Sequence, residues 1–387
     1  MPTTYVNTPG VQINEVRLGP PPIAGVGTST AGFVGVSPKT GRFQNQARLV
    51  TSAGQFKALY VLADATVAGD TDATTSTDLS RAVFGFFANG GKACYVVNTG
   101  STTALNIVAG IKLMEVIDEI AIIAAPGQTG ATVYQELNGQ ALRTGDRFAL
   151  LDPPTSKVSV LTEIMKSGSK RPPDSIYSAF YYSRIMVGPD LSGDSTGPSA
   201  ITPVGHIAGV YARVDASRGV HKAPANEPIL GALGVEHALT DADQDVLNQD
   251  GVNLLRVFSE GVVVWGARTL LARDAADRTY MYVNVRRLVN YIEESLQEGL
   301  RWAVFEPNTL PLRKQITRSV RGFLDGVWRD GGLFGATADE AYYVRFPESY
   351  NTATERSLGK LTVEIGLRVA YPAEFIIVRI GLLTQDS

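Results

Sequence analysis

The stretch that decides the fold is DLSRAVFGFFANGGKACYVVN, residues 78–98. Its first half places apolar side chains at helical spacing, and Thr77 and Asp78 can cap the start of that helix. Asn-Gly-Gly at 89–91 ends the helix, because glycine readily adopts the backbone angles of a helix C-cap. The apolar run 93–98 is typical of a buried strand. The stretch therefore predicts a helix that leads directly into a core sheet.

The same alternation continues along the middle of the chain. Its members are apolar runs typical of strands at 119–127, 148–154 and 176–187, and a helix opened by proline at 203–217. A separate short strand is expected earlier in the chain, at 30–37. Continuous apolar runs closed by Pro or Gly are typical of strands buried on both faces. Strands that alternate with helices predict a mostly parallel α/β layer over about 90–270.

The last third of the chain has a different pattern. One amphipathic helix is expected within 281–308, and a second after Asn308-Thr309, ending before Gly331-Gly332. The segment 360–383 then alternates apolar and polar residues, as a long strand does. Two helices followed by strand sequence predict an α+β domain distinct from the middle layer.

Both ends of the chain carry strand sequence without an obvious partner. Val11, Ile13 and Val16 have polar residues between them, and a triple proline at 20–22 separates them from the rest. A lone strand cannot satisfy its own backbone groups. The alternation of 360–383 likewise runs almost to the C-terminus. Two such ends predict that strands are exchanged between subunits.

Composition excludes several classes of protein. The 387 residues are 44% hydrophobic and 19% charged, which predicts two or three folded domains. The net charge of −3 argues against a nucleic-acid binder. We expect neither a membrane span nor a secretion signal, because no apolar run and no N-terminal pattern fits one. A single cysteine, Cys94, and three histidines leave little for a disulfide or a zinc site.

The segment GPSAITPVGHIAGVYA, residues 197–212, resembles the nucleophile segment of subtilisin-type proteases, with Ser199 in the nucleophile's place. All three histidines, however, follow Ser199 in the chain, whereas subtilisin's Asp and His precede its Ser. The sequence also lacks the G-x-S-x-G elbow of α/β-hydrolases. We therefore expect no catalytic residue, and keep a serine hydrolase as the alternative function.

Other motifs favour structural roles. The glycine-rich 25–32 lacks a phosphate-loop lysine, and Asp241, Asp243 and Asp245 fit an acidic helix start better than a calcium loop. The polar segment 215–226 is compatible with a site built from Asp215, Arg218 and His221, but a packed connection between domains is favoured. No metal, cofactor or phosphate site is expected.

One charged surface stands out on the helix expected after Thr309. Lys314, Arg318 and Arg321 are spaced i, i+4, i+7, opposite the apolar stripe. Two interpretations stay open, namely an ordinary solvated face and a docking face for an acidic partner.

An ordered set of motifs covers nearly the whole length of the chain. Its segments are TPGVQINEV (8–16), PIAGVGTSTAGFVG (22–35), GFFANGGKACYVVN (85–98), AGVYARVDASRGVHKAPAN (208–226), NLLRVFSEGVVVWGARTL (253–270), YVNVRRLVNYIEESLQEGLRWAVFEPN (282–308) and YPAEFIIVRI (371–380). This ordered set resembles the contractile tail sheath proteins of contractile phages and extracellular contractile injection systems. The resemblance departs mildly at Gln12, Asn14 and Glu15 of the opening motif.

This resemblance implies a structural subunit rather than an enzyme. Such subunits stack as rings of a helical homo-oligomer around an inner tube protein, between baseplate and terminal cap proteins, and contract to drive the tube through an envelope. Assembly is then expected in the bacterial cytoplasm, and the particle is a phage virion tail, a released injection system or a bacteriocin. No nucleic acid and no membrane insertion is expected. A static shell that never contracts is a further alternative.

The resemblance also assigns domains and contact residues. It implies an N-terminal arm at 1–24, a β-rich part at 25–90, a subtilisin-like α/β domain without a catalytic triad at 91–270, an α+β sheath domain at 271–370 and a C-terminal arm at 371–387. The implied contacts are Val11, Ile13 and Val16 in the donated N-terminal strand, Phe375, Ile377 and Arg379 in the C-terminal one, and Lys314, Arg318 and Arg321 toward the tube.

Overall fold

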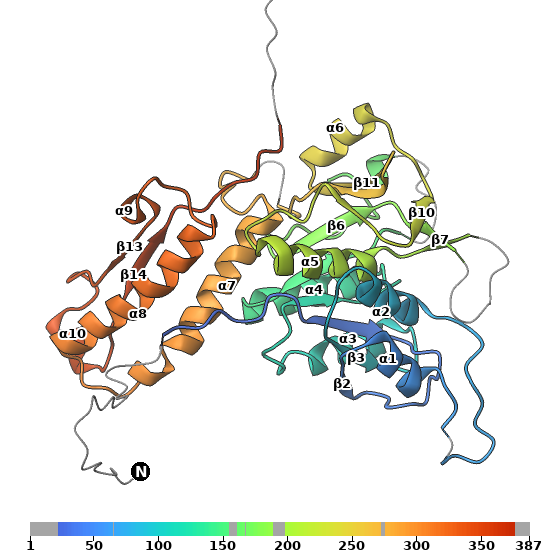
Figure 1. The fold of residues 1–387 in the computed structure, drawn as a ribbon, viewed down its shortest axis with the longest axis horizontal. Helices are drawn as coiled ribbons and strands as arrows, with labels where there is room; N and C mark the ends of the chain where they lie inside the picture. The colour runs from blue at the N-terminus through green and yellow to red at the C-terminus, as the bar shows by residue number, and fades with distance from the viewer. Residues whose placement is uncertain are drawn as a thin grey trace, which may run out of the picture.

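The computed structural model describes residues 22–375, except 65, 155–160, 167, 189–197 and 272–274. The proposed donor strand at Val11, Ile13 and Val16 lies outside the described residues, as do Ile377 and Arg379. Figure 1 shows two bodies joined side by side, with helix α7 (Val283–Gly299) between them. Every described helix is too short or too polar to cross a lipid bilayer.

The larger body is built on a mixed sheet that is mostly parallel. Among the described residues, nine strands form it, and antiparallel strands flank a parallel centre on both sides. In spatial order they are β2 (Ala47–Val50), β3 (Cys94–Asn98), β1 (Ala31–Gly35), β4 (Ile122–Ala124), β5 (Phe148–Leu151), β6 (Ser178–Tyr182), β11 (Val252–Phe258), β12 (Gly261–Trp265) and β9 (Glu227–Pro228). The predicted α/β layer is confirmed.

One expected domain boundary falls inside the large sheet. The resemblance implies a β-rich part at 25–90 followed by an α/β domain at 91–270. In the structure β1 pairs in parallel with both β3 and β4, so it lies inside the sheet of the second segment. Strands of the two segments therefore share one sheet. Strand order depends on long-range pairing, which local sequence patterns do not encode.

Helices cover both faces of this sheet (Figure 1). On one face are α1 (Ala53–Tyr60), α2 (Asp78–Ala88) and α5 (Val204–Arg218), and on the other α3 (Ala104–Leu113), α4 (Ala131–Thr144) and α6 (Asp241–Gln249). Because successive side chains of a strand point to opposite faces, Phe33 of β1 packs in the first core and Val34 in the second. Cys94 is fully buried in the first core, as a small core residue.

The start of α2 is as the sequence predicts. Thr77 is its N-cap, and its hydroxyl accepts an N–H from Ser80, whose own hydroxyl accepts the N–H of Thr77 in return.

The strand predicted at 176–187 is instead two strands, because β6 ends at Tyr182 and β7 (Ile185–Val187) joins a different sheet. That sheet has the order β10-β7-β8, with β10 at Ala232–Val235 and β8 at Ser199–Ile201. A 3-10 turn, Leu161–Glu163, precedes them.

The smaller body has its own core. Its elements are α7, a 3-10 turn (Arg301–Ala303), α8 (Leu310–Arg329), α9 (Ala338–Ala341), β13 (Tyr342–Arg345), α10 (Ala353–Ser357) and β14 (Glu364–Leu367). The apolar stripe of α8 packs against α7 and the antiparallel pair β13–β14. This confirms both helices, and Thr309 caps α8 by accepting the N–H of Leu312. The strand expected over 360–383 is shorter, since residues 368–375 are described without regular strand and 376–387 lie outside the described residues.

Candidate assembly interface

The interface between the two bodies is built around α7. Arg287 of α7 places Nη1 and Nη2 at 2.9 and 2.6 Å from the two carboxylate oxygens of Asp215 on α5. Thr28 completes the contact, because its hydroxyl donates to Asp215 at 2.7 Å and its carbonyl accepts from Arg287 at 2.9 Å. The Arg287 and Asp215 side chains are only 3% and 4% exposed. Charges buried this far need a partner, so this ion pair fixes α7 to the large sheet domain.

The segment 215–226 acts as the packed connection that the sequence favoured. Asp215 is used in the ion pair, and the carbonyl of His221 accepts an N–H from Asn284 of α7 at 2.8 Å. All three residues line one groove of about 770 Å³ between this connection and α8, and Arg218 is exposed there. The hydrogen bonds of Asp215 and His221 hold the connection to α7, as a packed connection between the bodies requires.

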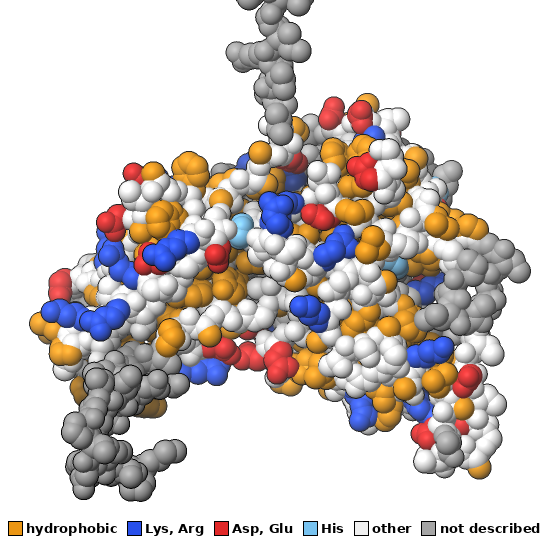
Figure 2. Space-filling model, viewed as in Figure 1, with side chains coloured by type: hydrophobic (Ala, Val, Ile, Leu, Met, Phe, Trp, Pro, Cys, Tyr) orange, Lys and Arg blue, Asp and Glu red, His pale blue; other side chains and the backbone are white. Residues whose placement is uncertain are grey.

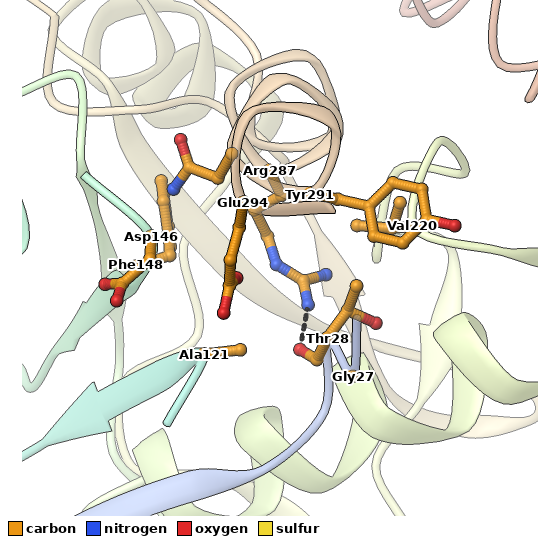
Figure 3. Close-up of a pocket in the computed structure, with 10 residues that line it drawn as sticks. Gly27, Thr28, Ala121, Asp146, Phe148, Val220, Arg287, Tyr291 and Glu294 are labelled. Carbon is orange, nitrogen blue, oxygen red and sulfur yellow. Dashed lines mark hydrogen bonds between the residues drawn. The ribbon is translucent and has the colours of Figure 1, made fainter. Parts of the chain in front are cut away.

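A small cavity lies behind the ion pair, lined by Arg287, Asn290 and Glu294 of α7 and by Thr28 and Phe148 of the large domain (Figure 3). Its volume is about 10 Å³. A cavity of that size holds about one water molecule at most. It is a packing gap of the interface and has no room for a substrate.

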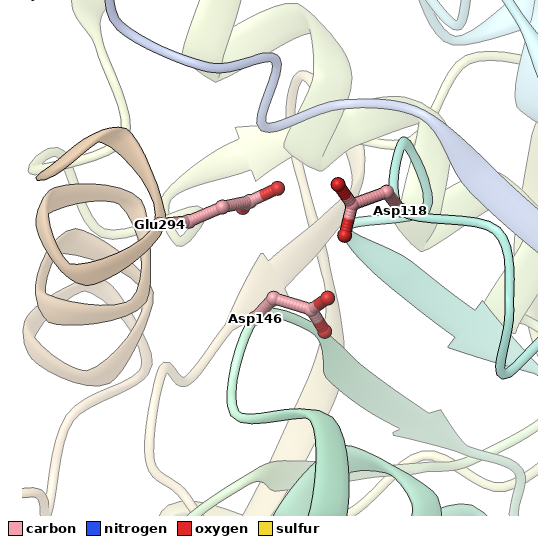
Figure 4. Close-up of side chains that lie close together, drawn as sticks. All are labelled: Asp118, Asp146 and Glu294. Carbon is pink, nitrogen blue, oxygen red and sulfur yellow. The ribbon is translucent and has the colours of Figure 1, made fainter. Parts of the chain in front are cut away.

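Three carboxylates meet across the same interface. The carboxylate oxygens of Asp118, Asp146 and Glu294 lie within 4.8 Å of one another, with Glu294 approaching from α7 and the aspartates from loops of the large domain (Figure 4). Asp146 is paired with Arg147 at 2.8 Å and Asp118 with Arg301 at 3.6 Å. Burial and then the two aspartates raise the pKa of Glu294 to about 7. The cluster is a like-charge contact that opposes the closed interface when Glu294 is ionised.

This contact predicts a stability that depends on pH. A carboxyl whose pKa is raised on folding stabilises the folded state fully below its ordinary pKa, and that contribution is lost as the pH rises toward about 7. We expect Glu294→Gln to raise Tm by roughly 2 °C at pH 8, where Glu294 is ionised, and to leave Tm unchanged at pH 5, where it is protonated. The expected rise is small because solvent reaches part of the side chain and screens the repulsion. Thermal melts at both pH values test this. Glu306→Gln, at an exposed carboxyl outside this cluster, is the control, and an equal shift at both pH values would contradict the expectation.

The basic surface predicted on α8 is exposed. Lys314, Arg318 and Arg321 all face solvent, whereas Ile316 and Val320 on the opposite side are buried. Arg321 pairs with Asp339 at 3.0 Å, and both side chains of that pair are largely exposed. Figure 2 shows the basic side chains on one face of this body as separate groups rather than one broad patch. The periodicity thus placed the three residues on one face, and their contact with a tube stays a prediction.

Comparison with known proteins identifies the family. A model described as the phage tail sheath protein central domain matches residues 93–270, and one described as the phage tail sheath C-terminal domain matches residues 275–382. Together these matches span most of the chain. The chain belongs to the phage tail sheath family. The boundary between the two models falls just before α7, where the two bodies meet.

Solved sheath structures match the whole chain. The sheath complex of an extracellular contractile injection system, PVC, in its contracted state is 28% identical, covers 99% of both chains and has a TM-score of 0.77. The contracted helical sheath of the anti-feeding prophage is also 28% identical, covers 99% of this chain and all of that one, and has a TM-score of 0.75. The chain is thus similar to sheath subunits over its full length.

Among curated relatives, the tail sheath protein of Escherichia phage P2 is 25% identical over half of this chain. The chain spans about half the length of that relative, 49%. A putative prophage major tail sheath protein of Pseudomonas aeruginosa is 24% identical over 65% of this chain and 62% of its own length. Both relatives are tail sheath proteins, which supports the same family. The matched part is a smaller share of their length than it is of the two solved sheath structures.

The edges of the small sheet are the candidate surface for strand exchange between sheath subunits. In the part of the chain that the structure describes, β13 and β14 pair only with each other, so each has one edge without a strand neighbour. Of the C-terminal contact residues, Phe375 is described, is 70% exposed and is not in a strand.

The Ser199 alternative finds no support in the described geometry. Ser199 is half-buried on β8, and among the described residues no hydrogen bond joins it to a histidine. His206 is buried, with its ring against Gly85 in the contact between α2 and α5, and burial lowers its pKa to about 4. Asp152, at the end of β5, accepts N–H groups from Gly127 and Val204 at the start of α5. These groups hold elements together rather than forming a triad.

Proposed function

We propose that the chain is the structural subunit of a contractile sheath, which polymerises around an inner tube and contracts to drive that tube through a target envelope. The observation that carries the proposal is the match over 99% of the chain to sheath subunits of two contracted systems. No step requires catalysis or a cofactor, since the work comes from packing stored at assembly. The subunit is therefore proposed as structural and not as an enzyme.

Strand donation is the proposed mode of assembly. Residues around Val11, Ile13 and Val16, and those around Phe375, Ile377 and Arg379, would add strands to the sheets of neighbouring subunits. The open edges of β13 and β14 support this, because an unpaired edge offers a row of free backbone donors and acceptors. A heterologous contact of this kind repeats without closing and so generates a helical array. Arms then keep the array connected while the globular bodies rotate.

The remaining partners follow from the same proposal. They are the inner tube, a baseplate and a terminal cap, and assembly would take place in the bacterial cytoplasm before release. Full-length similarity to the PVC and anti-feeding prophage sheaths favours an extracellular injection particle over a phage tail, since the match to the phage P2 protein covers half of this chain.

Negative-stain microscopy of the purified protein tests the function directly. We expect hollow tubes of one diameter with a helical surface lattice. Closed shells or monomers only, across a range of salt and protein concentrations, would contradict the proposal. A fluorophosphonate probe tests the hydrolase alternative, and labelling that is lost in Ser199→Ala would support it.

Charge reversal on α8 tests the tube-facing surface. We expect Lys314→Glu, Arg318→Glu and Arg321→Glu together to reduce assembly on preformed inner tubes at least tenfold while empty sheaths still form. The reason is that three exposed cations of a complementary interface become repulsive toward an acidic partner. Co-sedimentation with inner tubes measures the loss. Reversal of Lys92 and Lys112, which are exposed on the large domain, is the control, and undiminished loading of the triple variant would exclude this surface.

A further inference from the structure

After β14 the chain crosses from the small body back to the large one. Up to residue 370 it is held by the small sheet domain, because Arg368 donates its N–H to the carbonyl of Ala341 at 2.8 Å and Ala370 donates to Gly332 at 3.1 Å. The next residues leave that domain, pass the N-terminal end of α7 and reach α6 of the large domain (Figure 1). The segment 368–375, here called the strap, therefore contacts both bodies.

Glu374 is the residue of the strap that holds the large domain. Arg268, just after β12, approaches its carboxylate with Nη2 at 2.6 Å and Nε at 2.9 Å, a bidentate pair. Asn248 at the end of α6 donates its side-chain N–H at 2.9 Å, and the hydroxyl of Tyr282 donates at 2.8 Å. One carboxylate thus accepts from three side chains that are far from it in sequence.

The burial and charge of this contact make it strong. The side chains of Arg268 and Glu374 are 13% and 19% exposed. Burial alone would raise the pKa of Glu374, but the hydrogen bonds from Arg268, Asn248 and Tyr282 outweigh it and lower the pKa below its ordinary value. The carboxylate is therefore ionised at neutral pH. The Tyr371 ring, edge-on to Tyr282 at 6.4 Å between centroids, packs the strap beside the ion pair.

We propose that the strap is a lock, in which Glu374 fixes the departure point of the C-terminal arm on the large domain through Arg268, Asn248 and Tyr282. The role of this lock in a sheath rests on the proposed function, whereas the lock itself rests only on these contacts. The partner that pulls on it is a second copy of this chain, which receives the arm. Force on the arm then passes into the nine-stranded sheet instead of through β13 and β14 alone.

Sheet architecture explains why such a lock is useful. A two-stranded sheet is marginally stable on its own, and β14 immediately precedes the strap. An arm anchored only through β14 would peel that strand from β13 when the neighbouring subunit moves. A charge-assisted contact to the large domain, placed between β14 and the arm, shields the small sheet from that pull.

Limited proteolysis of the full-length protein before assembly tests the lock. Phe375 is 70% exposed, but cleavage after it needs the strap to detach, because the preceding Glu374 must also enter the protease. We expect Glu374→Gln and Arg268→Gln each to raise the rate of chymotryptic cleavage after Phe375 at least tenfold, which corresponds to about 1.4 kcal/mol. Mass spectrometry of the released C-terminal peptide gives the rate. Glu348→Gln is the control, because Glu348 is 78% exposed with its nearest cation at 3.6 Å.

The cleavage rate tests the lock, and the stability of assembled sheaths tests its role in the proposed function. Unchanged cleavage in both variants would overturn the lock whether or not sheaths form. The variants could be cleaved faster and still form sheaths that resist urea as well as those of the unaltered protein. That result would overturn the proposal that force on the arm passes into the large domain through Glu374. We expect faster cleavage together with sheaths that come apart at lower urea. Failure of even the unaltered chain to form tubes would instead count against the proposed function and leave the cleavage result to decide the lock.

Discussion

Removal of residues 1–18 is expected to give a folded, soluble protein that no longer forms sheaths. The body should survive, because the described fold begins at residue 22 and Ile23, the first buried residue, packs against Gly299 of α7. Assembly should fail, since the truncation removes Val11, Ile13 and Val16, which are proposed to pair with a neighbour's sheet. Circular dichroism and thermal melting measure the fold, and sedimentation with negative-stain microscopy measures assembly.

A shorter truncation and a full-length variant are the controls. Removal of residues 1–5 stops before the Thr-Pro-Gly turn at 8–10 and should leave assembly unchanged. Ile13→Asp keeps the length and should impair assembly nearly as strongly as the truncation, because a charge on the buried face of a donated strand is costly. If the chain without residues 1–18 still polymerised into normal tubes, strand donation by the N-terminal arm would be wrong.

Local signals in the sequence predicted the elements of the fold well. Thr77 before α2 and Thr309 before α8 are N-caps in the structure, because a cap depends on a few adjacent residues. The apolar stripe of α8 likewise placed Lys314, Arg318 and Arg321 in solvent, since helical periodicity fixes the opposite face. These features follow from residues within one or two turns of each other.

Long-range pairing could not be predicted in the same way. Nothing in the sequence of β1 indicates that it lies between β3 and β4, because its neighbours are about 60 and 90 residues away. The meeting of Asp118, Asp146 and Glu294 depends on where α7 docks, and no spacing of these residues signals it. Glu374 lies in a segment that alternates like a strand, so its contact with Arg268 was missed. The polar segment 215–226, by contrast, was correctly interpreted as a packed connection between domains, because its polar residues lie at the interface.

Loss of the buried ion pair at the domain interface is expected to have the largest effect on stability. Arg287→Met leaves the carboxylate of Asp215, 4% exposed, with the Thr28 hydroxyl as its one remaining side-chain partner among the described residues. Removing one member of a buried pair typically costs about 3–5 kcal/mol, because the other charge stays desolvated. Urea unfolding followed by tryptophan fluorescence measures the loss, and Trp302 and Trp328 report on the small domain while Trp265 reports on the large one.

An exposed pair across the same interface provides the matched control. Arg301 and Asp118 are 65% and 66% exposed at 3.6 Å, so Arg301→Met should cost less than about 1 kcal/mol. The double variant Arg287→Met with Asp215→Leu should recover much of the loss, since it removes the unpaired charge together with its partner. Equal costs for Arg287→Met and Arg301→Met would show that the buried pair does not hold the bodies together. A large cost that the double variant relieves would instead show that the charge left on Asp215 is the cause, and that α7 is the element through which the two bodies are stabilised as one.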